Sequence, residues 1–275
     1  MIKTLKEFNI GRPFAQLRAV PVSLGKDGQG WLFIHSSDGN KDPWEEELTF
    51  PTDTLKLTLC APDGRILWWR DLGPGIIPGI WYSPVISFDL DGDGVDEIWT
   101  VGNANPELPF TLAYRTLEQI DPFNGEVVSR MPWPTFVDTM SRSYRFSLLG
   151  GYSHGEPVLV CAQGTYTDMY LQGYNKGLEK RWDILIPRDE PGARASHVFP
   201  VIDFDEDGVD EIFWGERILS IDDGHEISCY DRDRFRGHSD IIVPFIDPDT
   251  LEKYIYTCRE GDEREGVKRV VTFHA

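Results

Sequence analysis

Two nine-residue stretches carry the same acidic pattern, DLDGDGVDE at residues 89–97 and DFDEDGVDE at residues 203–211. Short apolar runs flank both of them: SPVISF and IWTVG around the first, HVFPVI and IFWG around the second. Short apolar runs that are bounded by Gly- and Asp-rich segments are typical of β-strands joined by tight loops. Each acidic stretch is therefore predicted to join two strands.

A second marker recurs out of phase with the acidic loops. It is a glycine turn that enters a strand, at Gly64, Gly125, Gly177 and Gly224, with intervals of 61, 52 and 47 residues. No helical periodicity lies between these turns, and units of about 50 residues with three or four short strands are typical of propeller blades. The chain is predicted to be all-β, a β-propeller in one domain (1–275). The expected units are 12–53, 54–105, 106–167, 168–219 and 220–275.

The third and fifth units depart from the pattern. RFSLLGGYSHGEPVLV (145–160) stands where an acidic loop is expected, and FIDPDTLEKYIY (245–256) keeps only a remnant of one. The last residues, VKRVVTFHA, are expected to form a strand without a following partner. Propellers close with about four to eight blades. The sequence leaves open a closed ring of five blades or a propeller that is incomplete at its C-terminus.

The composition excludes several classes of function. The 275 residues hold 27 Lys and Arg against 46 Asp and Glu, so the formal net charge is −19. Nucleic acid and anionic membrane surfaces are disfavoured as partners, because both need a basic face. The four cysteines form no CxxC pair and are expected to be reduced thiols. The N-terminus, MIKTLKEFNIGRPF, lacks the apolar run of a signal peptide, which predicts a cytoplasmic protein, or a secreted one whose signal has been removed.

The acidic loops are predicted to bind calcium in a structural role. Calcium takes about six to eight oxygen ligands, and carboxylates at positions 1, 3 and 5 of a tight loop converge on one point. The carbonyl at position 7 and the acid at position 9 complete the shell. The predicted ligands are Asp89, Asp91, Asp93, the Val95 carbonyl and Glu97 in one loop, and Asp203, Asp205, Asp207, the Val209 carbonyl and Glu211 in the other.

These residues carry a family resemblance. The loops resemble the FG-GAP type calcium repeats of integrin-like propellers. The longer stretch ASHVFPVIDFDEDGVDEIFWGERILSIDDGHEISCYDRDRFRGHSDIIVPFIDPD (195–249) resembles rhamnogalacturonan lyases and propeller-type ulvan lyases, and we place it nearer to the ulvan lyases. In this comparison a His-containing segment, the acidic loop, a DDDG-like turn and a GHGDA-like segment follow one another in order. The resemblance covers roughly residues 55–260.

The resemblance implies β-elimination at a uronic acid of an anionic polysaccharide. It implies a His or Tyr base, a Tyr or His acid, and an Arg, His or metal ion that neutralises the uronate carboxylate. In a propeller, the segments before the innermost strands gather on one face, so SRSYR (141–145), GARASH (192–197) and RGHSD (236–240) are expected to converge. The candidate catalytic residues are His197, His238, Tyr144, Arg194, Arg142 and His154. His35, His225 and His274 are interpreted as surface residues.

Other interpretations remain open. His197 and His238 with Cys258 or Cys229 have the ligand types of a zinc site, although their spacing does not require them to meet. The FG-GAP pattern alone is equally compatible with a non-catalytic, calcium-binding propeller that binds carbohydrate or protein. A glycoside hydrolase would use two carboxylates, and Glu156 and Glu216 lie outside the acidic loops.

Overall fold

The computed structural model describes residues 3–4, 6–42, 49–135, 144–260 and 268–274. Throughout these ranges the regular structure is β-strand, with two short 3₁₀ turns at Gly25–Asp27 and Lys176–Leu178. The all-β prediction is confirmed. No helix in the described ranges is long and apolar enough to cross a membrane. The prediction of a cytoplasmic or secreted location stays a prediction.

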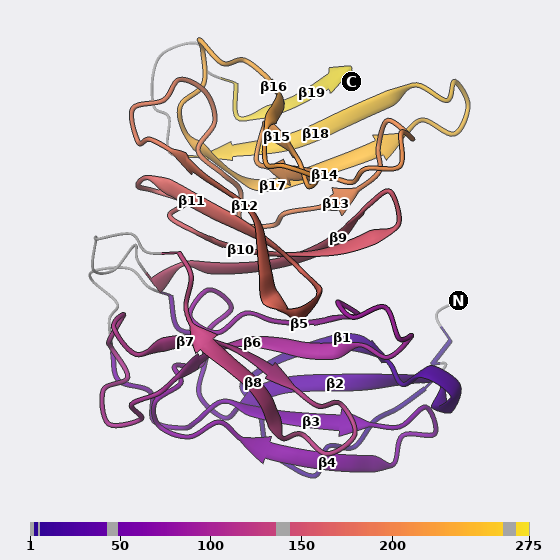
Figure 1. Ribbon diagram of the computed structural model, residues 1–275, viewed down its shortest axis with the longest axis vertical. Coiled ribbons are helices and arrows are strands. Elements are labelled where there is room, and N and C mark those ends of the chain that lie inside the picture. Colours follow the sequence, from indigo (N-terminus) through magenta and orange to yellow (C-terminus); the bar gives the residue numbers. More distant parts are fainter. Residues whose placement is uncertain (1–2, 5, 43–48, 136–143, 261–267, 275) are drawn as a thin grey trace. The chain divides into compact units, whose positions relative to one another are not determined.

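The chain divides into two compact units, residues 1–136 with 143–148, and residues 137–142 with 149–275. Unit one contains two antiparallel sheets, each in the order of the sequence (Figure 1). The first sheet consists of β1 (Gln16–Ser23), β2 (Gln29–Ser36), β3 (Lys56–Cys60) and β4 (Ile66–Asp71). The second consists of β5 (Val85–Phe88), β6 (Glu97–Asn103), β7 (Arg115–Ile120) and β8 (Val127–Pro132).

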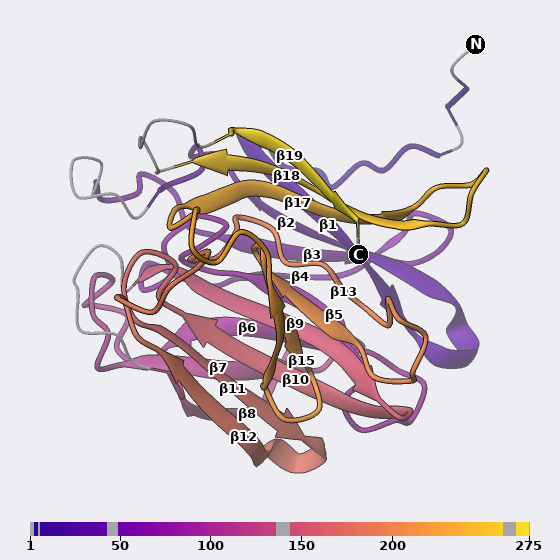
Figure 2. The same cartoon turned by 90° about the horizontal axis from the view of Figure 1, so that it is seen from above.

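Unit two contains three antiparallel sheets, again in sequence order. They consist of β9 (Phe146–Ser153), β10 (Glu156–Gln163), β11 (Met169–Asn175) and β12 (Glu179–Ile186); of β13 (Val201–Ile202), β14 (Glu211–Trp214), β15 (Arg217–Ser220) and β16 (Glu226–Cys229); and of β17 (His238–Ile246), β18 (Lys253–Glu260) and β19 (Val270–His274). Figure 2 shows β17, β18 and β19 side by side. The boundary between the units falls within β9.

These sheets explain both sequence markers. The acidic loops join the first and second strands of their sheets, β5 to β6 and β13 to β14, as expected. Each glycine turn joins the third and fourth strands of a sheet. The expected boundary between residues 53 and 54 therefore falls inside the first sheet, between β2 and β3. Similar turns reveal the period of a repeat but not the strand at which each sheet begins. The expected unit boundaries therefore do not coincide with the ends of the sheets.

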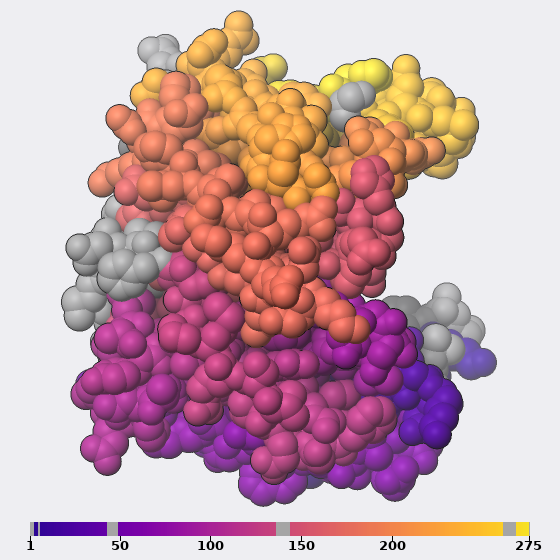
Figure 3. All heavy atoms as spheres, in the orientation of Figure 1, coloured from indigo at the N-terminus to yellow at the C-terminus, as the bar shows by residue number. Residues whose placement is uncertain are grey.

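Sheets within one unit pack face to face. In unit one, Leu32 and Leu57 of the first sheet share a buried cluster with Ile98 and Ile120 of the second. In unit two, clusters of the same kind join the sheet β9–β12 to β13–β16 and the sheet β13–β16 to β17–β19. Side chains fill the spaces that the ribbon leaves between strands in each unit (Figure 3). Burial of apolar area between sheets is the main stabilising term.

The tryptophan on a fourth strand and the glycine turn of the next sheet form one recurring contact. Trp68 donates its indole N–H to the Pro122 carbonyl at 2.7 Å, and Trp182 donates to the Ile221 carbonyl at 2.8 Å. A Cβ at Gly125 would lie 2.8 Å from the Trp68 ring, and a Cβ at Gly224 would lie 2.9 Å from the Trp182 ring. Both glycines also have positive φ. The turn therefore requires glycine for two reasons, the lack of space for a Cβ and the backbone conformation.

Candidate functional site

The segments that carry His197 and His238 are paired in unit two. Ser196 and Ser239 form a parallel bridge, in which the His197 amide donates to the Ser239 carbonyl at 2.9 Å and the Ser239 amide donates to the Ala195 carbonyl at 2.9 Å. His197 precedes the sheet β13–β16, and His238 is the first residue of β17. The two imidazole rings lie 4.9 Å apart between centroids. The predicted convergence of these two segments is confirmed.

A tyrosine that the sequence analysis did not select joins the two histidines. The Tyr166 hydroxyl lies 3.0 Å from His197 Nε2 and 3.3 Å from His238 Nε2. Tyr166 belongs to the loop between β10 and β11, which is not part of the sequence repeat. Strand direction could have revealed it, because in an antiparallel sheet the end of the second strand lies at the edge where the first strand begins. The loop after β10 therefore returns to the edge of the sheet where the segments before first strands were expected.

Carboxylates complete the cluster. Asp240 Oδ1 lies 3.6 Å from His197 Nδ1, and Glu260 Oε2 lies 3.2 Å from His238 Nε2. Single donor atoms of His197, His238 and Asp240 all lie within 4.8 Å of one another. Two imidazoles with a carboxylate are a common ligand set for a divalent cation. His238 is buried, whereas the His197 side chain is 24% exposed, so the cluster is open to solvent on one side.

The zinc interpretation with a cysteine is not supported by this arrangement. Of the described residues, the group that could hold a metal ion at these histidines includes Asp240 and neither Cys229 nor Cys258. Cys258 instead faces Ile241 across the β17–β18 pair, and burial raises the pKa of the Cys229 thiol.

Arg194 was expected to neutralise a uronate carboxylate, and the structure gives it a different role. Its buried guanidinium donates to the carbonyls of Thr167 and Arg188, and to that of Pro187 at 3.3 Å. Burial, and then the nearby charges of Arg217 and Arg188, lower the pKa of Arg194 to about 10. These carbonyls accept hydrogen bonds from the guanidinium N–H groups that a substrate carboxylate would need. Arg194 therefore holds the backbone beside Tyr166 in place.

Tyr144 belongs to unit one and is a core residue. It is 2% exposed and packs among aromatic rings, with the Tyr82 centroid 5.3 Å away. Burial raises the pKa of Tyr144, although the Arg115 charge opposes this. A phenol in such a core is not open to a polymer, so the catalytic interpretation is wrong for this residue. Arg142 lies outside the described residues.

His154 does not join the histidine cluster either. It occupies the β9–β10 turn with φ of 51°, and its amide donates to the Gly208 carbonyl of the second acidic loop. Tyr166 follows the opposite end of β10, a strand of eight residues or about 26 Å. His154 therefore lies at the other end of the strand from the histidine cluster, and its catalytic role stays a prediction.

The remaining histidines were expected at the surface, and two of the three are there. The side chains of His225 and His274 are 61% and 63% exposed. His35 is fully buried, with Nε2 3.0 Å from the Thr58 hydroxyl. Burial, followed by the charge of Lys56, lowers the pKa of His35. His35 is thus a core histidine on β2 and not a surface residue.

Each acidic loop gathers three carboxylates. Oxygens of Asp89, Asp91 and Glu97 lie within 4.8 Å of one another, and so do those of Asp203, Asp205 and Glu211. In the absence of a cation, burial is the main cause that raises the pKa values of Glu97 and Glu211 to about 7. Three converging carboxylates, one of them buried, fit a hard cation such as calcium.

The other predicted ligands have partners within the loop. Asp93 Oδ1 accepts the Val95 amide, and Asp207 Oδ1 accepts the Val209 amide, both at 2.8 Å. These contacts close the turn of each loop. Six of the ten predicted ligands are thus carboxylates that converge in the structure. The ligand roles of Asp93, Val95, Asp207 and Val209 stay a prediction.

The acid at position 8 of each loop binds the neighbouring sheet. Asp96 Oδ2 accepts the Ser23 amide at 2.7 Å, and Asp210 Oδ2 accepts the Tyr152 amide at 2.7 Å. Ser23 ends β1, and Tyr152 lies at the end of β9, so each loop holds the first hairpin of the preceding sheet. This second function of the repeated acids was not visible in the sequence.

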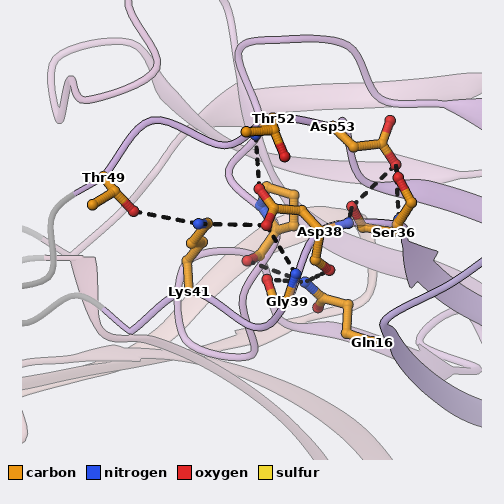
Figure 4. Close-up of polar contacts among 10 residues, drawn as sticks. Gln16, Ser36, Asp38, Gly39, Lys41, Thr49, Thr52 and Asp53 are labelled. Atoms are coloured by element: carbon orange, nitrogen blue, oxygen red, sulfur yellow. Dashed lines mark hydrogen bonds and ion pairs between the residues drawn. The ribbon is translucent and has the colours of Figure 1, made fainter.

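Unit one also contains a hollow of about 670 Å³, lined by Phe50, Pro51, Thr52, Asp53, Thr54, Pro74, Ile76, Pro106, Glu107 and Pro109. The polar contacts in Figure 4 hold one wall of it: Asp38 Oδ2 accepts the Thr52 amide at 2.7 Å, and Asp53 Oδ2 accepts the Ser37 amide at 2.8 Å. The described lining offers two carboxylates and no cation. An anionic polymer is therefore disfavoured in this hollow.

The chain is similar in sequence to proteins of known activity. No known protein-family model matches the chain. Rhamnogalacturonan exolyase YesX of Bacillus subtilis (strain 168) is 29% identical over 256 residues, covering 77% of this chain and 40% of YesX. Rhamnogalacturonan endolyase YesW of the same organism is 26% identical, covering 86% of this chain and 44% of YesW. The chain is a relative of rhamnogalacturonan lyases.

Solved structures agree with this relationship at the level of the fold. The crystal structure of the exotype rhamnogalacturonan lyase YesX superposes with a TM-score of 0.77 at 22% identity, over 98% of this chain and 49% of that one. Bacillus licheniformis rhamnogalacturonan lyase PL11 gives 0.73 at 23% identity, over 92% and 48%. This chain spans about half the length of these relatives. The resemblance to rhamnogalacturonan lyases is confirmed, and these matches do not support the nearer placement beside ulvan lyases.

Proposed function

We propose that this chain acts as a polysaccharide lyase on a rhamnogalacturonan-like polymer, with its active site at the histidine cluster. The observation that carries the proposal is the contact of one tyrosine hydroxyl with two imidazoles on paired segments. The similarity to rhamnogalacturonan lyases supports the same reaction class. We further propose that the packed four-stranded sheets are blades of a β-propeller.

The reaction is β-elimination within the polymer. A base removes the proton from C5 of a uronate residue, the electron pair forms the C4–C5 double bond, and the bond from C4 to the glycosidic oxygen breaks. That oxygen leaves with a proton. Tyr166 can exchange a proton with either imidazole, because both Nε2 atoms lie within hydrogen-bond distance of its hydroxyl. In this arrangement an ionised Tyr166 can take the C5 proton, and a protonated group of the cluster can give a proton to the leaving oxygen.

The uronate carboxylate must be neutralised, since deprotonation at C5 places further negative charge beside it. Arg194 is occupied by backbone carbonyls, so we assign this task to a divalent cation held by His197, His238 and Asp240. Imidazoles that hold the cation hydrogen-bond to Tyr166 and do not themselves act as the base. When bound, the cation supplies positive charge to the carboxylate. Glu260 reaches the same His238 nitrogen from β18. Calcium in the two acidic loops, by contrast, is proposed to be structural.

The test is an elimination assay on rhamnogalacturonan, with the ultraviolet absorbance of the unsaturated uronate as readout. Tyr166→Phe removes the hydroxyl that contacts both histidines, and we expect kcat to fall by about 10²- to 10⁴-fold, the usual contribution of acid–base catalysis. His225→Ala is the matched control, because this histidine is exposed on the β15–β16 turn of the same unit.

Two results would contradict the proposal. If the folded, cation-loaded protein bound the polymer but formed no unsaturated product, the non-catalytic binding propeller would be the better description. If new reducing ends formed without a double bond, the protein would be a hydrolase. Full activity of Tyr166→Phe would leave the reaction class intact and remove Tyr166 from the site.

A further inference from the structure

The β14–β15 turn lies directly beneath both histidine segments. Gly215 and Glu216 form this turn between the paired residues Trp214 and Arg217. Gly215 has φ of 69°, and a Cβ added to it would lie 2.6 Å from the Ala195 carbonyl oxygen. Ala195 is two residues before His197. The turn therefore touches the backbone that carries the first histidine and leaves no room for a side chain at Gly215.

Glu216 connects the same turn to the second histidine. Its fully buried carboxylate receives two hydrogen bonds from Arg259, Nε to Oε1 at 2.7 Å and Nη2 to Oε2 at 2.5 Å. Arg259 precedes Glu260, whose carboxylate contacts His238. The Ser239 hydroxyl lies 3.5 Å from Glu216 Oε1 and accepts a hydrogen bond from Thr257 at 2.9 Å.

Ser239 is the point at which these contacts meet the site. It directly follows His238, and its carbonyl accepts the amide of His197. Any shift of Ser239 therefore changes the spacing of the two imidazoles. Asp231 gives Arg259 a second carboxylate at 2.8 Å, which fixes the guanidinium from the other side.

Stability alone does not account for this ion pair. Withdrawing two charges from water costs several kcal/mol per ion, and well-packed apolar residues in place of a buried pair are often neutral or stabilising. What a bidentate pair provides is a fixed distance and direction between two backbone segments. Here the two segments are the β14–β15 turn, which supports His197, and β18, which supports His238 and Glu260.

We propose that Glu216, Arg259 and Gly215 are positioning residues that set the spacing of His197 and His238 for the reaction. This inference rests on the proposed lyase function. The three residues act through the backbone of the two histidine segments and do not touch the substrate. A displacement of about 1 Å between reacting groups can cost about 10²-fold in rate, so removing the pair should lower kcat far more than it changes KM.

The experiment uses two variants and one control in the full chain. Glu216→Gln keeps the shape of the side chain and removes its charge. The double variant Glu216→Leu with Arg259→Met replaces the pair by apolar groups, and we expect it to fold, because such replacements are often neutral or stabilising. Glu118→Gln is the matched control, because Glu118 is also buried and paired with an arginine, Arg130, at 2.7 Å, but it lies in unit one.

The readouts separate positioning from folding. They are the thermal midpoint, the imidazole nitrogen signals of His197 and His238, the exchange rate of the His197 amide, and kcat and KM for elimination. We expect about tenfold or greater loss of kcat, faster exchange of the His197 amide and shifted imidazole signals in both Glu216 variants. The control variant should change none of these.

Two outcomes would overturn the inference. The first is a Glu216→Gln protein with unchanged imidazole signals and unchanged amide exchange. The second is a double variant in which the thermal midpoint, the imidazole signals and kcat all return to wild-type values, because the pair would then serve folding alone. If the wild-type protein showed no elimination, the proposed function would fail, while the imidazole and amide measurements would still decide whether the pair positions the histidines.

Discussion

Replacement of Arg194 distinguishes a substrate ligand from a structural residue. Arg194→Ala removes three hydrogen bonds to the carbonyls of Thr167, Arg188 and Pro187. A hydrogen bond to a charged group contributes about 1.5–3 kcal/mol, and a buried acceptor left without a partner costs about 1–3 kcal/mol. Since one of these contacts is long and such contributions are not additive, we expect a loss of about 3–5 kcal/mol in the free energy of unfolding.

This loss is large enough to measure. At about 2–4 °C per kcal/mol for a chain of this size, the thermal midpoint should fall by about 6–20 °C. Calorimetry and urea unfolding would be compared with the elimination rate per folded molecule. Arg188→Ala is the control, because its exposed side chain carries the same charge. A variant at Arg194 with wild-type stability and no affinity for uronate polymers would refute the structural role and restore the carboxylate-binding prediction.

Three further perturbations test other parts of the molecule. Gly125→Ala should lower the free energy of unfolding by about 2–5 kcal/mol, because the new Cβ would lie 2.8 Å from an indole ring and the residue has positive φ. Gly73→Ala, which has similar φ and open space around it, should lose only the contribution of backbone strain, and urea midpoints would compare the two variants. Calcium at a hundredfold excess over its Kd should add about 2.7 kcal/mol per acidic loop, and Asp203→Asn should weaken one of the two transitions in a calorimetric titration. Although burial alone would raise the pKa of Asp53, hydrogen bonds from Lys56 and from the backbone hold it below 3.8, so its stabilisation is present above that pH and is lost on acidification. The urea midpoints of wild type and Asp53→Asn should therefore differ at pH 6, and the difference should shrink progressively as the pH falls below 3.8 towards the lowered pKa of Asp53.

The local features of the fold were predictable because turn chemistry is local. Glycine with positive φ is needed at Gly125 and Gly224 whatever surrounds them, and alternating acids close the same loop at 89–97 and 203–211. The phase of the sheets was not predictable in this way. A hairpin turn has the same sequence pattern between any two strands. Only the observed pairing of β2 with β3 shows that residues 53 and 54 lie within one sheet and not between two.

The candidate site was predictable as far as it follows the repeat. His197 and His238 occupy equivalent positions before or at the start of first strands, so the repeat alone places them at the same edge of adjacent sheets. Tyr166 has no equivalent in the repeat. Arg194 and Tyr144 have suitable chemistry, but burial and carbonyl contacts, which the sequence does not show, assign them to the structure.

The strands of unit two also reconcile a net charge of −19 with an anionic substrate. The second acidic loop ends at Glu211, and β14, four residues or about 13 Å long, separates it from Gly215, which lies against Ala195 beside His197. The Debye length at physiological ionic strength is about 8 Å, so the loop carboxylates are largely screened at the histidines. Bound calcium would reduce their charge further. Removing calcium with a chelator should therefore lower activity mainly by destabilising the folded sheets. Its direct electrostatic effect on the histidines should be small, because the strands separate the loop carboxylates from the histidine cluster.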